Sequence, residues 1–184
     1  MSWEGDVLLW IQDNLRNAVL DPICKFMGII GTHGEFAIAI ALLLMIIPKT
    51  RRTGIVCALS LASTHIVANM IIKKIVNRTR PYEVVEGLSS LSGPMDNPSF
   101  PSGHAAATFA VLFVVFLMMS KRFGIPALVI SLFMAYSRLH VGVHYPTDVI
   151  AGIAFGVFFA CLYTFIYKKK FAPDVKGTEP LKGK

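Results

Sequence analysis

Three short segments of the chain carry side chains whose types and spacing could bind and attack a phosphoryl group. The first, residues 73–81, holds four cations in eight positions and ends in Arg80-Pro81. Cations at the end of an apolar run are costly near hydrocarbon unless an anion neutralises them. Because proline disfavours helical conformation at the preceding residue, Arg80 can turn back toward such an anion. The alternative is a basic anchor at the membrane interface, with side chains that extend toward water.

The second segment is Pro101-Ser102-Gly103-His104, directly before a long apolar run. Ser102 stands where a helix N-cap is expected, and Gly103 leaves the backbone N–H groups accessible. Helix N-termini bind phosphate because these N–H groups lack partners and the helix dipole favours negative charge. His104 would then lie in the first turn, beside the anion. The alternative is a helix start that is capped and nothing more.

The third segment contains Arg138, His144 and Asp148. Pro146 is well placed for the start of a helix, with Asp148 in its first turn. A carboxylate on one imidazole nitrogen fixes the tautomer and leaves the other nitrogen free to attack. The spacing therefore predicts a His–Asp pair suited to nucleophilic chemistry. A pair that only caps a helix is the alternative.

Long apolar segments must position these groups. The chain is 54% hydrophobic and 16% charged, whereas a soluble domain carries about 25% charged residues. We therefore predict an all-α, integral-membrane helical bundle with about five spans of roughly 17–25 residues. The expected spans are centred on residues 36–47 and lie over 53–72, 102–120, about 123–136 and 147–167. The first and the fourth are short for a span, and residues 21–32 could form a short helix under the bundle.

Residues 3–20 predict an amphipathic helix that precedes the spans. Apolar residues recur every four positions from Trp3, with polar residues between them. Two tryptophans suit a helix in the membrane interface, although a helix packed against the bundle fits equally well. Residues 82–100 combine turn formers in a long loop, which is typical of a functional loop.

The distribution of charge predicts the orientation. Of eighteen Lys and Arg residues, eleven fall at one set of span ends, and positive residues favour the cytoplasmic side. They are Lys49, Arg51, Arg52, Lys121, Arg122, Lys168, Lys169, Lys170, Lys176, Lys182 and Lys184. The three chemical segments then face the extracytoplasmic side of the cell membrane. Because the cations do not form one patch, the net charge of +7 gives no indication of nucleic-acid binding.

Together the patterns Lys-x6-Arg-Pro, Pro-Ser-Gly-His and Ser-Arg-x5-His-x3-Asp closely resemble the type 2 phosphatidic acid phosphatase family, over roughly residues 30–167. The resemblance implies a phosphatase that needs no metal and no other cofactor. It implies that His144 is the nucleophile and becomes phosphohistidine, that His104 is general acid and then base, and that Asp148 orients His144. It implies a phosphate site made of Lys73, Arg80, Ser102, Gly103 and Arg138.

Several polar residues fall outside this motif set. Lys74 and Arg78 are assigned to an anionic headgroup or to the membrane interface. His140 is interpreted as a structural neighbour of the site. His65 and Asn69 lie inside the second expected span, where polar groups are costly. They either serve function or form hydrogen bonds between helices.

The predicted activity is hydrolysis of a lipid phosphate or diphosphate within the bilayer. Negative oxygens on phosphorus repel nucleophiles, so cations and backbone donors must neutralise them. An extracytoplasmic site favours undecaprenyl diphosphate, and phosphatidylglycerol phosphate and phosphatidic acid are further candidates. The alternatives are a lipid phosphotransferase and a non-catalytic membrane protein that binds lipid headgroups. We expect a single domain over residues 1–170 and a disordered cytoplasmic tail over 171–184, and the sequence predicts no oligomeric state.

Overall fold

The computed structural model describes residues 2–171, which form helices and connections without a strand. The α-helices are α1 (Trp3–Leu15), α2 (Leu20–Ile30), α3 (Glu35–Ile46), α4 (Arg51–Thr64), α5 (Lys73–Val76), α6 (Pro81–Val84), α7 (Gly103–Met118), α8 (Lys121–His140) and α9 (Pro146–Phe171). A 3₁₀ turn, η1 (Thr32–Gly34), joins α2 to α3, and a π-helical segment, η2 (His65–Ile72), joins α4 to α5. The all-α prediction is confirmed, and the tail expected beyond Phe171 lies outside the described residues.

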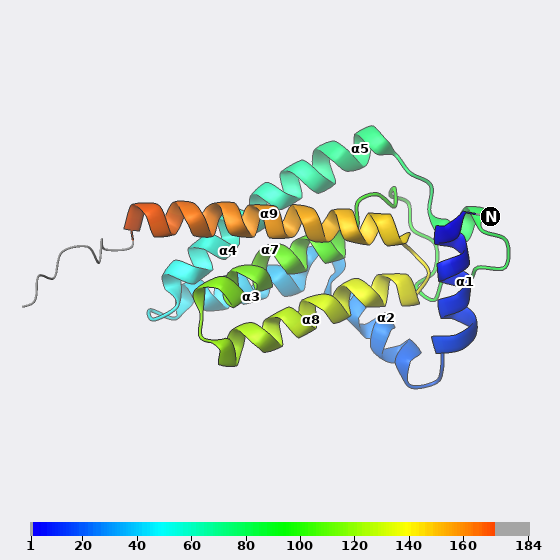
Figure 1. Cartoon of the computed structure of the whole chain (residues 1–184), viewed down its shortest axis with the longest axis horizontal. Helices are drawn as coiled ribbons and strands as arrows, with labels where there is room; N and C mark the ends of the chain where they lie inside the picture. The colour runs from blue at the N-terminus through cyan, green and yellow to red at the C-terminus, as the bar shows by residue number, and fades with distance from the viewer. Residues whose placement is uncertain (1, 172–184) are drawn as a thin grey trace, which may run out of the picture.

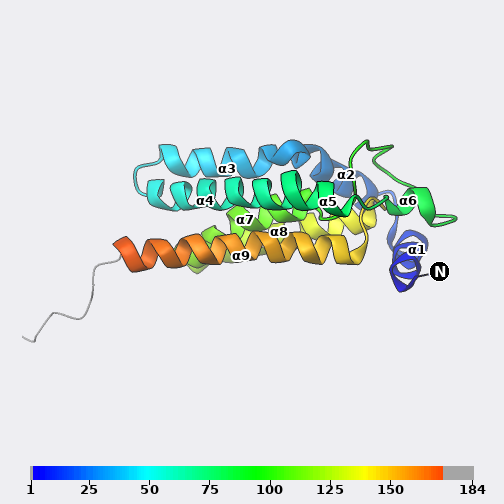
Figure 2. The same cartoon turned by 90° about the horizontal axis from the view of Figure 1, so that it is seen from above.

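The long helices lie side by side along one axis of the molecule (Figures 1 and 2). Helix α7 is the centre of the bundle and packs against α4, α8 and α9, with every residue from Ala105 to Leu112 buried. Glycines let α9 approach it closely: a Cβ at Gly156 would lie 2.6 Å from the carbonyl oxygen of Ala106. Such contacts between small residues are typical of helix packing in membranes. This packing fixes the start of α7, where Gly103 and His104 lie.

The observed helices follow the order of the expected spans and differ from several of them in length. The continuous helix from Arg51 onward, α8 and α9 are each long and apolar enough to cross a membrane, and α2 and α3 qualify as one pair bent by 50°. The fourth expected span is longer than predicted, because α8 continues to His140 through polar residues that the site requires. The third is shorter: α7 has 16 residues, slightly below the usual 17–25.

Helix α1 lies across the end of the bundle instead of along it (Figure 1). One face, which includes Glu4, Leu8 and Ile11, is buried. The opposite face leaves Trp3 and Trp10 exposed by 59% and 57%. Helix α1 therefore packs against the bundle with one face and turns an aromatic face outward. Tryptophans in this position suit a membrane interface.

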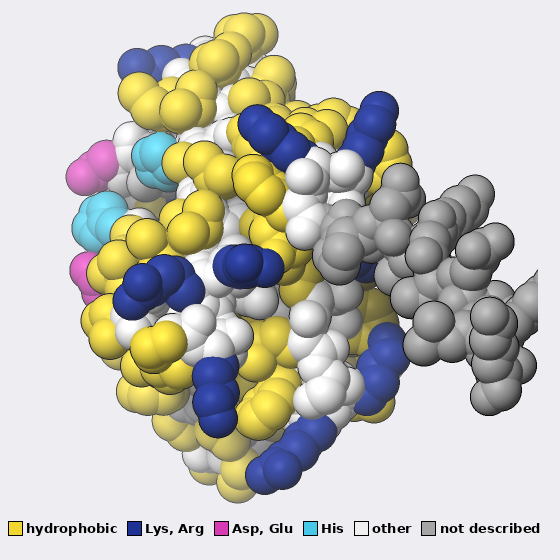
Figure 3. All heavy atoms as spheres, turned by 90° about the vertical axis from the view of Figure 1, so that its left-hand side faces the viewer, with side chains coloured by type: hydrophobic (Ala, Val, Ile, Leu, Met, Phe, Trp, Pro, Cys, Tyr) yellow, Lys and Arg dark blue, Asp and Glu magenta, His cyan; other side chains and the backbone are white. Residues whose placement is uncertain are grey.

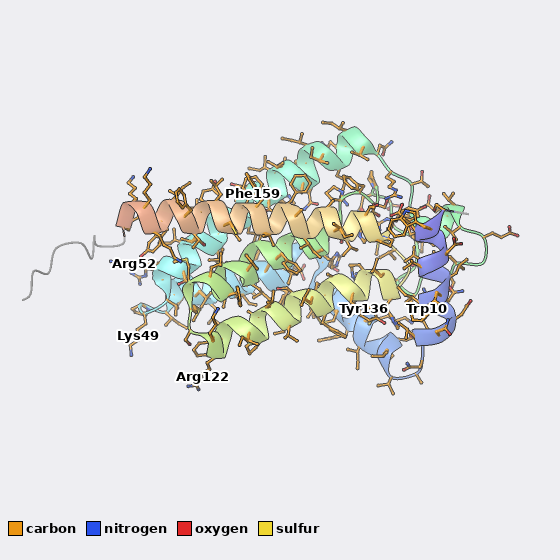
Figure 4. All side chains as sticks on the ribbon, viewed as in Figure 1. Trp10, Lys49, Arg52, Arg122, Tyr136 and Phe159 are labelled. Carbon is orange, nitrogen blue, oxygen red and sulfur yellow. The ribbon has the colours of Figure 1, made fainter. Side chains whose placement is uncertain are left out.

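The predicted segregation of charge is confirmed for the described part of the chain, and Lys176, Lys182 and Lys184 lie outside it. Figure 3 views the end of the bundle opposite α1, where Lys and Arg side chains are spread over the face. Figure 4 labels Lys49, Arg52 and Arg122 among them. The three chemical segments lie at the other end, near α1. Which side of a membrane each end faces stays a prediction.

Candidate active site

The three segments meet around one cavity of about 1080 Å³ at the α1 end of the bundle. The first segment comprises α5 and the residues that follow it, and the second is the start of α7. The third runs from the end of α8 to the start of α9. Of the predicted site residues, those that line the cavity are Lys73, Arg80, Gly103, His104, Arg138 and His144. Ser102 and Asp148 are also close but fully buried, with Asp148 behind His144. Residues up to 75 positions apart in the sequence are thus brought together.

Backbone carbonyl groups of the 82–100 loop hold two of the cations in place. Lys73 Nζ donates to the carbonyl of Pro98 at 2.9 Å, and Arg80 Nε donates to that of Asn97 at 2.9 Å. Arg80 Nη1 also donates to the carbonyl of Val143 at 2.8 Å. Within residues 2–171, no carboxylate lies within 4.0 Å of Lys73, Arg80 or Arg138. The cavity therefore has positive charge to offer to an anion.

Helix α2 forms the wall next to the third cation. Arg138 is 1% exposed, and its Nη2 donates to the carbonyl of Cys24 at 3.1 Å. The carbonyl of Gly28 lies 3.0 Å from His104 Nε2. Because carbonyl oxygen only accepts, this contact places a proton on Nε2 of His104. The sequence interpretation of residues 21–32 as a helix under the bundle is right, but it missed these two contacts; the small residues Gly28 and Gly31, one helical turn apart, were the available signal.

The start of α7 agrees with the predicted N-cap in position and differs from it in bonding. Ser102 has the extended backbone of an N-cap, but its hydroxyl makes no capping bond and is buried without a partner. Its backbone N–H donates instead to the carbonyl of Asp148 at 2.9 Å. The first N–H groups of a helix have no intrahelical acceptor. At Gly103, which lines the cavity, they remain available to an anion.

His144 and Asp148 form the predicted pair. Nδ1 of His144 lies 3.6 Å from Oδ2 of Asp148, which is longer than a hydrogen bond; such catalytic contacts often tighten when substrate binds. Burial lowers the pKa of His144 to about 4, Asp148 opposes this change, and the positive charges of Arg80 and Lys73 reinforce it. The imidazole is therefore neutral at pH 7 and keeps a lone pair for attack.

Arg78 lies in a different place from the one expected. It was assigned to a headgroup or to the interface, but Nη1 donates to Oδ1 of Asp148 at 2.7 Å and Nη2 to Oε2 of Glu4 at 2.6 Å. Its guanidinium lies 3.7 Å over the ring of Tyr145. The role of Glu4 was not predicted from the sequence, because Glu4 is 74 positions from Arg78. It also lies on a helix whose acidic residues resemble a solvent-facing surface. The other unassigned cation, Lys74, is exposed.

The remaining polar residues divide into two groups. His140 is buried away from the cavity, with Asp21 at 2.8 Å and Tyr136 at 3.0 Å, in agreement with a structural role. His65 and Asn69 do line the cavity, and they contact each other at 3.2 Å within η2 instead of linking two helices. π-Helical turns are frequent at functional sites.

The cavity continues from the cationic end into an apolar groove. Ile38, Ala41 and Leu42 of α3 form one wall, and Ala58, Leu61, Ala62 and Ile66 of α4 and η2 form the other. These walls belong to the bent pair of α2 and α3 and to the helix that begins at Arg51, which are long and apolar enough to cross a membrane. One cavity thus offers positive charge and helix N–H groups at one end and an apolar lining at the other.

Comparison of the sequence with known proteins agrees with this geometry. The chain is 33% identical to a lipid A 1-phosphatase of Rhizobium etli over 118 residues, 59% of this chain and 50% of that protein. It therefore spans about half the length of such relatives. It is 32% identical to an undecaprenyl-diphosphatase of Sulfolobus acidocaldarius over 165 residues, 90% of this chain and 75% of that protein.

Solved structures share the fold. LpxE of Aquifex aeolicus superposes with a TM-score of 0.80 at 22% identity, over 90% of this chain and 96% of that one. A transmembrane PAP2-type phosphatidylglycerolphosphate phosphatase of Bacillus subtilis gives 0.73 at 20% identity, over 91% and 86%. Residues 53–172, which carry all three motifs, match the PAP2 superfamily. The chain belongs to the PAP2 superfamily.

Proposed function

We propose that this protein is a lipid phosphatase that hydrolyses a membrane lipid phosphate or diphosphate through a phosphohistidine on His144. The observation that carries the proposal is the single cavity in which three cations and a helix N-terminus meet a neutral, buried histidine and an apolar groove. A lipid phosphate has the same two halves, a tetrahedral anion and a hydrocarbon chain. The second cavity, which is lined by residues such as Leu44, Leu112 and Phe123, contains none of the predicted phosphate-binding residues.

In the first step the cations and the N–H groups at Gly103 neutralise the phosphoryl oxygens, with the two arginines suited to bidentate contact. Since Nδ1 of His144 faces Asp148, Nε2 attacks phosphorus. The P–N bond forms while the P–O bond to the leaving lipid breaks. His104, protonated on both ring nitrogens beside the bound anion, donates the Nδ1 proton to the departing oxygen and keeps its Nε2–H on the carbonyl of Gly28.

In the second step His104 accepts a proton from water, whose oxygen attacks the phosphorus of phosphohistidine. The P–N bond breaks, and inorganic phosphate leaves. Asp148 holds the imidazole and stabilises its positive charge in the intermediate. Because Lys73, Arg80 and Arg138 supply the charge that neutralises the phosphoryl group, we propose that the reaction needs no metal ion.

Undecaprenyl diphosphate is the substrate that we favour. The undecaprenyl-diphosphatase of Sulfolobus acidocaldarius aligns with 90% of this chain, and undecaprenyl-diphosphatase BcrC of Bacillus subtilis aligns with 80% at 28% identity. The shorter alignments with lipid A 1-phosphatases make a phosphorylated glycolipid the next candidate. Phosphatidylglycerol phosphate and phosphatidic acid complete the set.

A phosphate-release assay on the purified protein in detergent tests this function. Undecaprenyl diphosphate should give the highest kcat/KM among these lipids, and an excess of EDTA should leave the rate unchanged. A phosphorylated acceptor in place of free phosphate would establish a transferase instead. Lipid binding without any turnover would establish a headgroup-binding protein, and loss of activity in EDTA would contradict metal independence.

We propose further that the site faces the extracytoplasmic side of the cell membrane, because the cation-rich end lies opposite to it. Glu86 is exposed in the 82–100 loop, near the site. A Glu86→Cys variant should react with a membrane-impermeant maleimide in intact cells. Lys49→Cys, at the other end, should react only after lysis. The reverse pattern would overturn this orientation.

The lowered pKa of His144 predicts how pH acts on the protein. Imidazole in an unfolded chain titrates near 6.5, so between about pH 6.5 and 4 the unfolded state binds more protons than the folded state. The stability linked to neutral His144 is therefore complete above about pH 6.5 and is lost as the pH falls toward about 4. The measurement is kcat/KM as a function of pH, which reports on the free enzyme once the ionisation of the substrate phosphate near pH 6 has been corrected for. As the pH falls, the corrected kcat/KM should decline only near pH 4, where His144 becomes protonated. A decline centred near pH 6.5 would contradict the neutral nucleophile.

A further inference from the structure

A charged bridge connects α1 to the pair formed by His144 and Asp148. The guanidinium of Arg78 donates to Asp148 at 2.7 Å on one side and to Glu4 at 2.6 Å on the other. Oε1 of Glu4 also accepts from the backbone N–H of Thr147 at 3.1 Å and from its hydroxyl at 2.6 Å. Arg78 Nη1 lies a further 2.8 Å from that hydroxyl. Both terminal nitrogens of the Arg78 guanidinium are therefore fixed by hydrogen bonds.

Arg78 is the partner that a buried carboxylate requires. The side chain of Asp148 is fully buried, and an isolated buried charge is strongly unfavourable. Its Oδ2 accepts from the backbone N–H of Tyr145 at 2.8 Å, and its Oδ1 is held by Arg78. Within residues 2–171, Arg78 is the only Lys or Arg whose nitrogen lies within 4.0 Å of Asp148. Without Arg78, one oxygen of Asp148 would lose its donor, and the carboxylate could rotate away from His144.

Glu4 in turn keeps Arg78 in place. Its side chain is 11% exposed, against 28% for that of Arg78. Burial alone would raise the pKa of Glu4, but hydrogen bonds from Thr147 and Arg78 hold the pKa below its ordinary value, so Glu4 is ionised at pH 7. The ring of Tyr145, 3.7 Å from the guanidinium, limits its tilt.

We propose that Arg78 is a positioning residue of the phosphatase reaction and that Glu4 of α1 fixes it. The proposal rests on the function proposed above. Arg78 does not line the cavity; it acts by holding the carboxylate of Asp148 toward Nδ1 of His144. Helix α1 lies outside residues 53–172, which match the superfamily. This chain therefore completes its catalytic pair with an element of its own N-terminal region.

The proposal has a kinetic signature that loss of packing does not produce. A carboxylate that loses its cationic partner takes up a proton at higher pH, so the acid limb of kcat should move upward when the bridge is broken. The other charged or titratable groups that face the pair are Lys73, Arg80, His104 and Tyr145. They are unchanged in the variants used below, so a moved acid limb reports on the bridge.

The test compares Glu4→Gln and Arg78→Gln with wild type on undecaprenyl diphosphate in detergent. Glu4→Gln keeps an acceptor for Thr147 and removes the charge that holds Arg78, whereas Arg78→Gln removes the cationic partner of Asp148. Each variant should lower kcat by about 10–100-fold, with KM within about twofold. In Arg78→Gln the acid limb of kcat should also move upward by about one pH unit. The double variant should be no slower than Arg78→Gln alone, because Glu4 acts through Arg78.

Matched controls separate this role from a structural one. Asp6→Asn changes an exposed carboxylate on α1, and Arg122→Gln removes an exposed cation at the opposite end; both should retain wild-type kcat. If Glu4→Gln does not fold, Arg78→Gln decides alone. An unchanged kcat, or an unmoved acid limb in Arg78→Gln, would overturn the proposal. An inactive wild type would overturn the proposed function and this role with it, whereas an active wild type beside an unchanged Glu4→Gln would overturn only the positioning role.

Discussion

Replacement of His144 by alanine should lower phosphate release from undecaprenyl diphosphate by about 10⁴-fold or more, because the nucleophile of a covalent mechanism has no substitute. Its position supports this expectation: it lines the cavity beside Lys73 and Arg80, and burial keeps its ring neutral. Substrate affinity should change little, since the cations that neutralise the phosphoryl group are retained. The measurement is kcat and KM for purified wild type and variant in the same detergent.

His140→Gln is the matched control for that experiment. His140 lies four positions earlier, is buried between Asp21 and Tyr136, and does not line the cavity. Its loss should reduce thermal stability while kcat stays within about tenfold of wild type, because a broken buried pair affects folding first. Equal losses of kcat in both variants, or wild-type turnover by His144→Ala, would contradict the assignment of the nucleophile.

The addition of one methyl group at Gly28 should lower kcat/KM by about 100-fold. A Cβ at this position would lie 2.6 Å from Nη2 and 2.8 Å from Nη1 of Arg138. Arg138 is 1% exposed, so its guanidinium can give way only by moving within the site. The carbonyl of Gly28 also contacts His104, and a displaced α2 would disturb that histidine as well.

Stability separates this effect from misfolding. Alanine is favoured over glycine in a helix by about 1 kcal/mol, so Gly28→Ala should not unfold α2. Phe26→Ala, at a position 57% exposed on the same helix, should keep wild-type kcat/KM. The experiment pairs kcat/KM with the midpoint of thermal unfolding in detergent. Wild-type kcat/KM in Gly28→Ala would show that α2 does not set the position of Arg138.

Much of the fold follows from the sequence, because hydrocarbon admits few structures. Helices satisfy their backbone groups internally, so long apolar runs in a membrane protein predict helices with little ambiguity. Their ends are less predictable, since tertiary contacts decide them. Helix α8 extends to His140, and its last turn carries Arg138, which contacts the carbonyl of Cys24, a residue 114 positions away. The 50° bend between α2 and α3 falls at η1, where His33 and Gly34 have positive φ angles of 52° and 79°.

The residues that line the cavity were predictable where charge and motif spacing coincide, as they do at Lys73, Arg80, His104 and His144. Groups that act through the backbone were harder to predict, because the carbonyl of Asn97 has no signature in its side chain and the small size of Gly28 and Gly31 is only a weak signal. Glu4 and Arg78 were missed for another reason: each looks like a surface charge when read alone. Only the fold shows that they are 2.6 Å apart.

The central claim is that His144 carries the phosphoryl group, and trapping of the intermediate tests it most directly. Undecaprenyl diphosphate labelled with ³²P in the terminal phosphate is mixed with the protein, and the reaction is stopped within milliseconds in alkali, in which phosphohistidine survives. The label should be found on His144 and be absent from His144→Ala. It should accumulate in His104→Gln, because a lipid phosphate is a weakly basic leaving group that can depart without a proton, whereas the second step lacks its base. Turnover by wild type with no label on His144, or with label on another residue, would contradict the account.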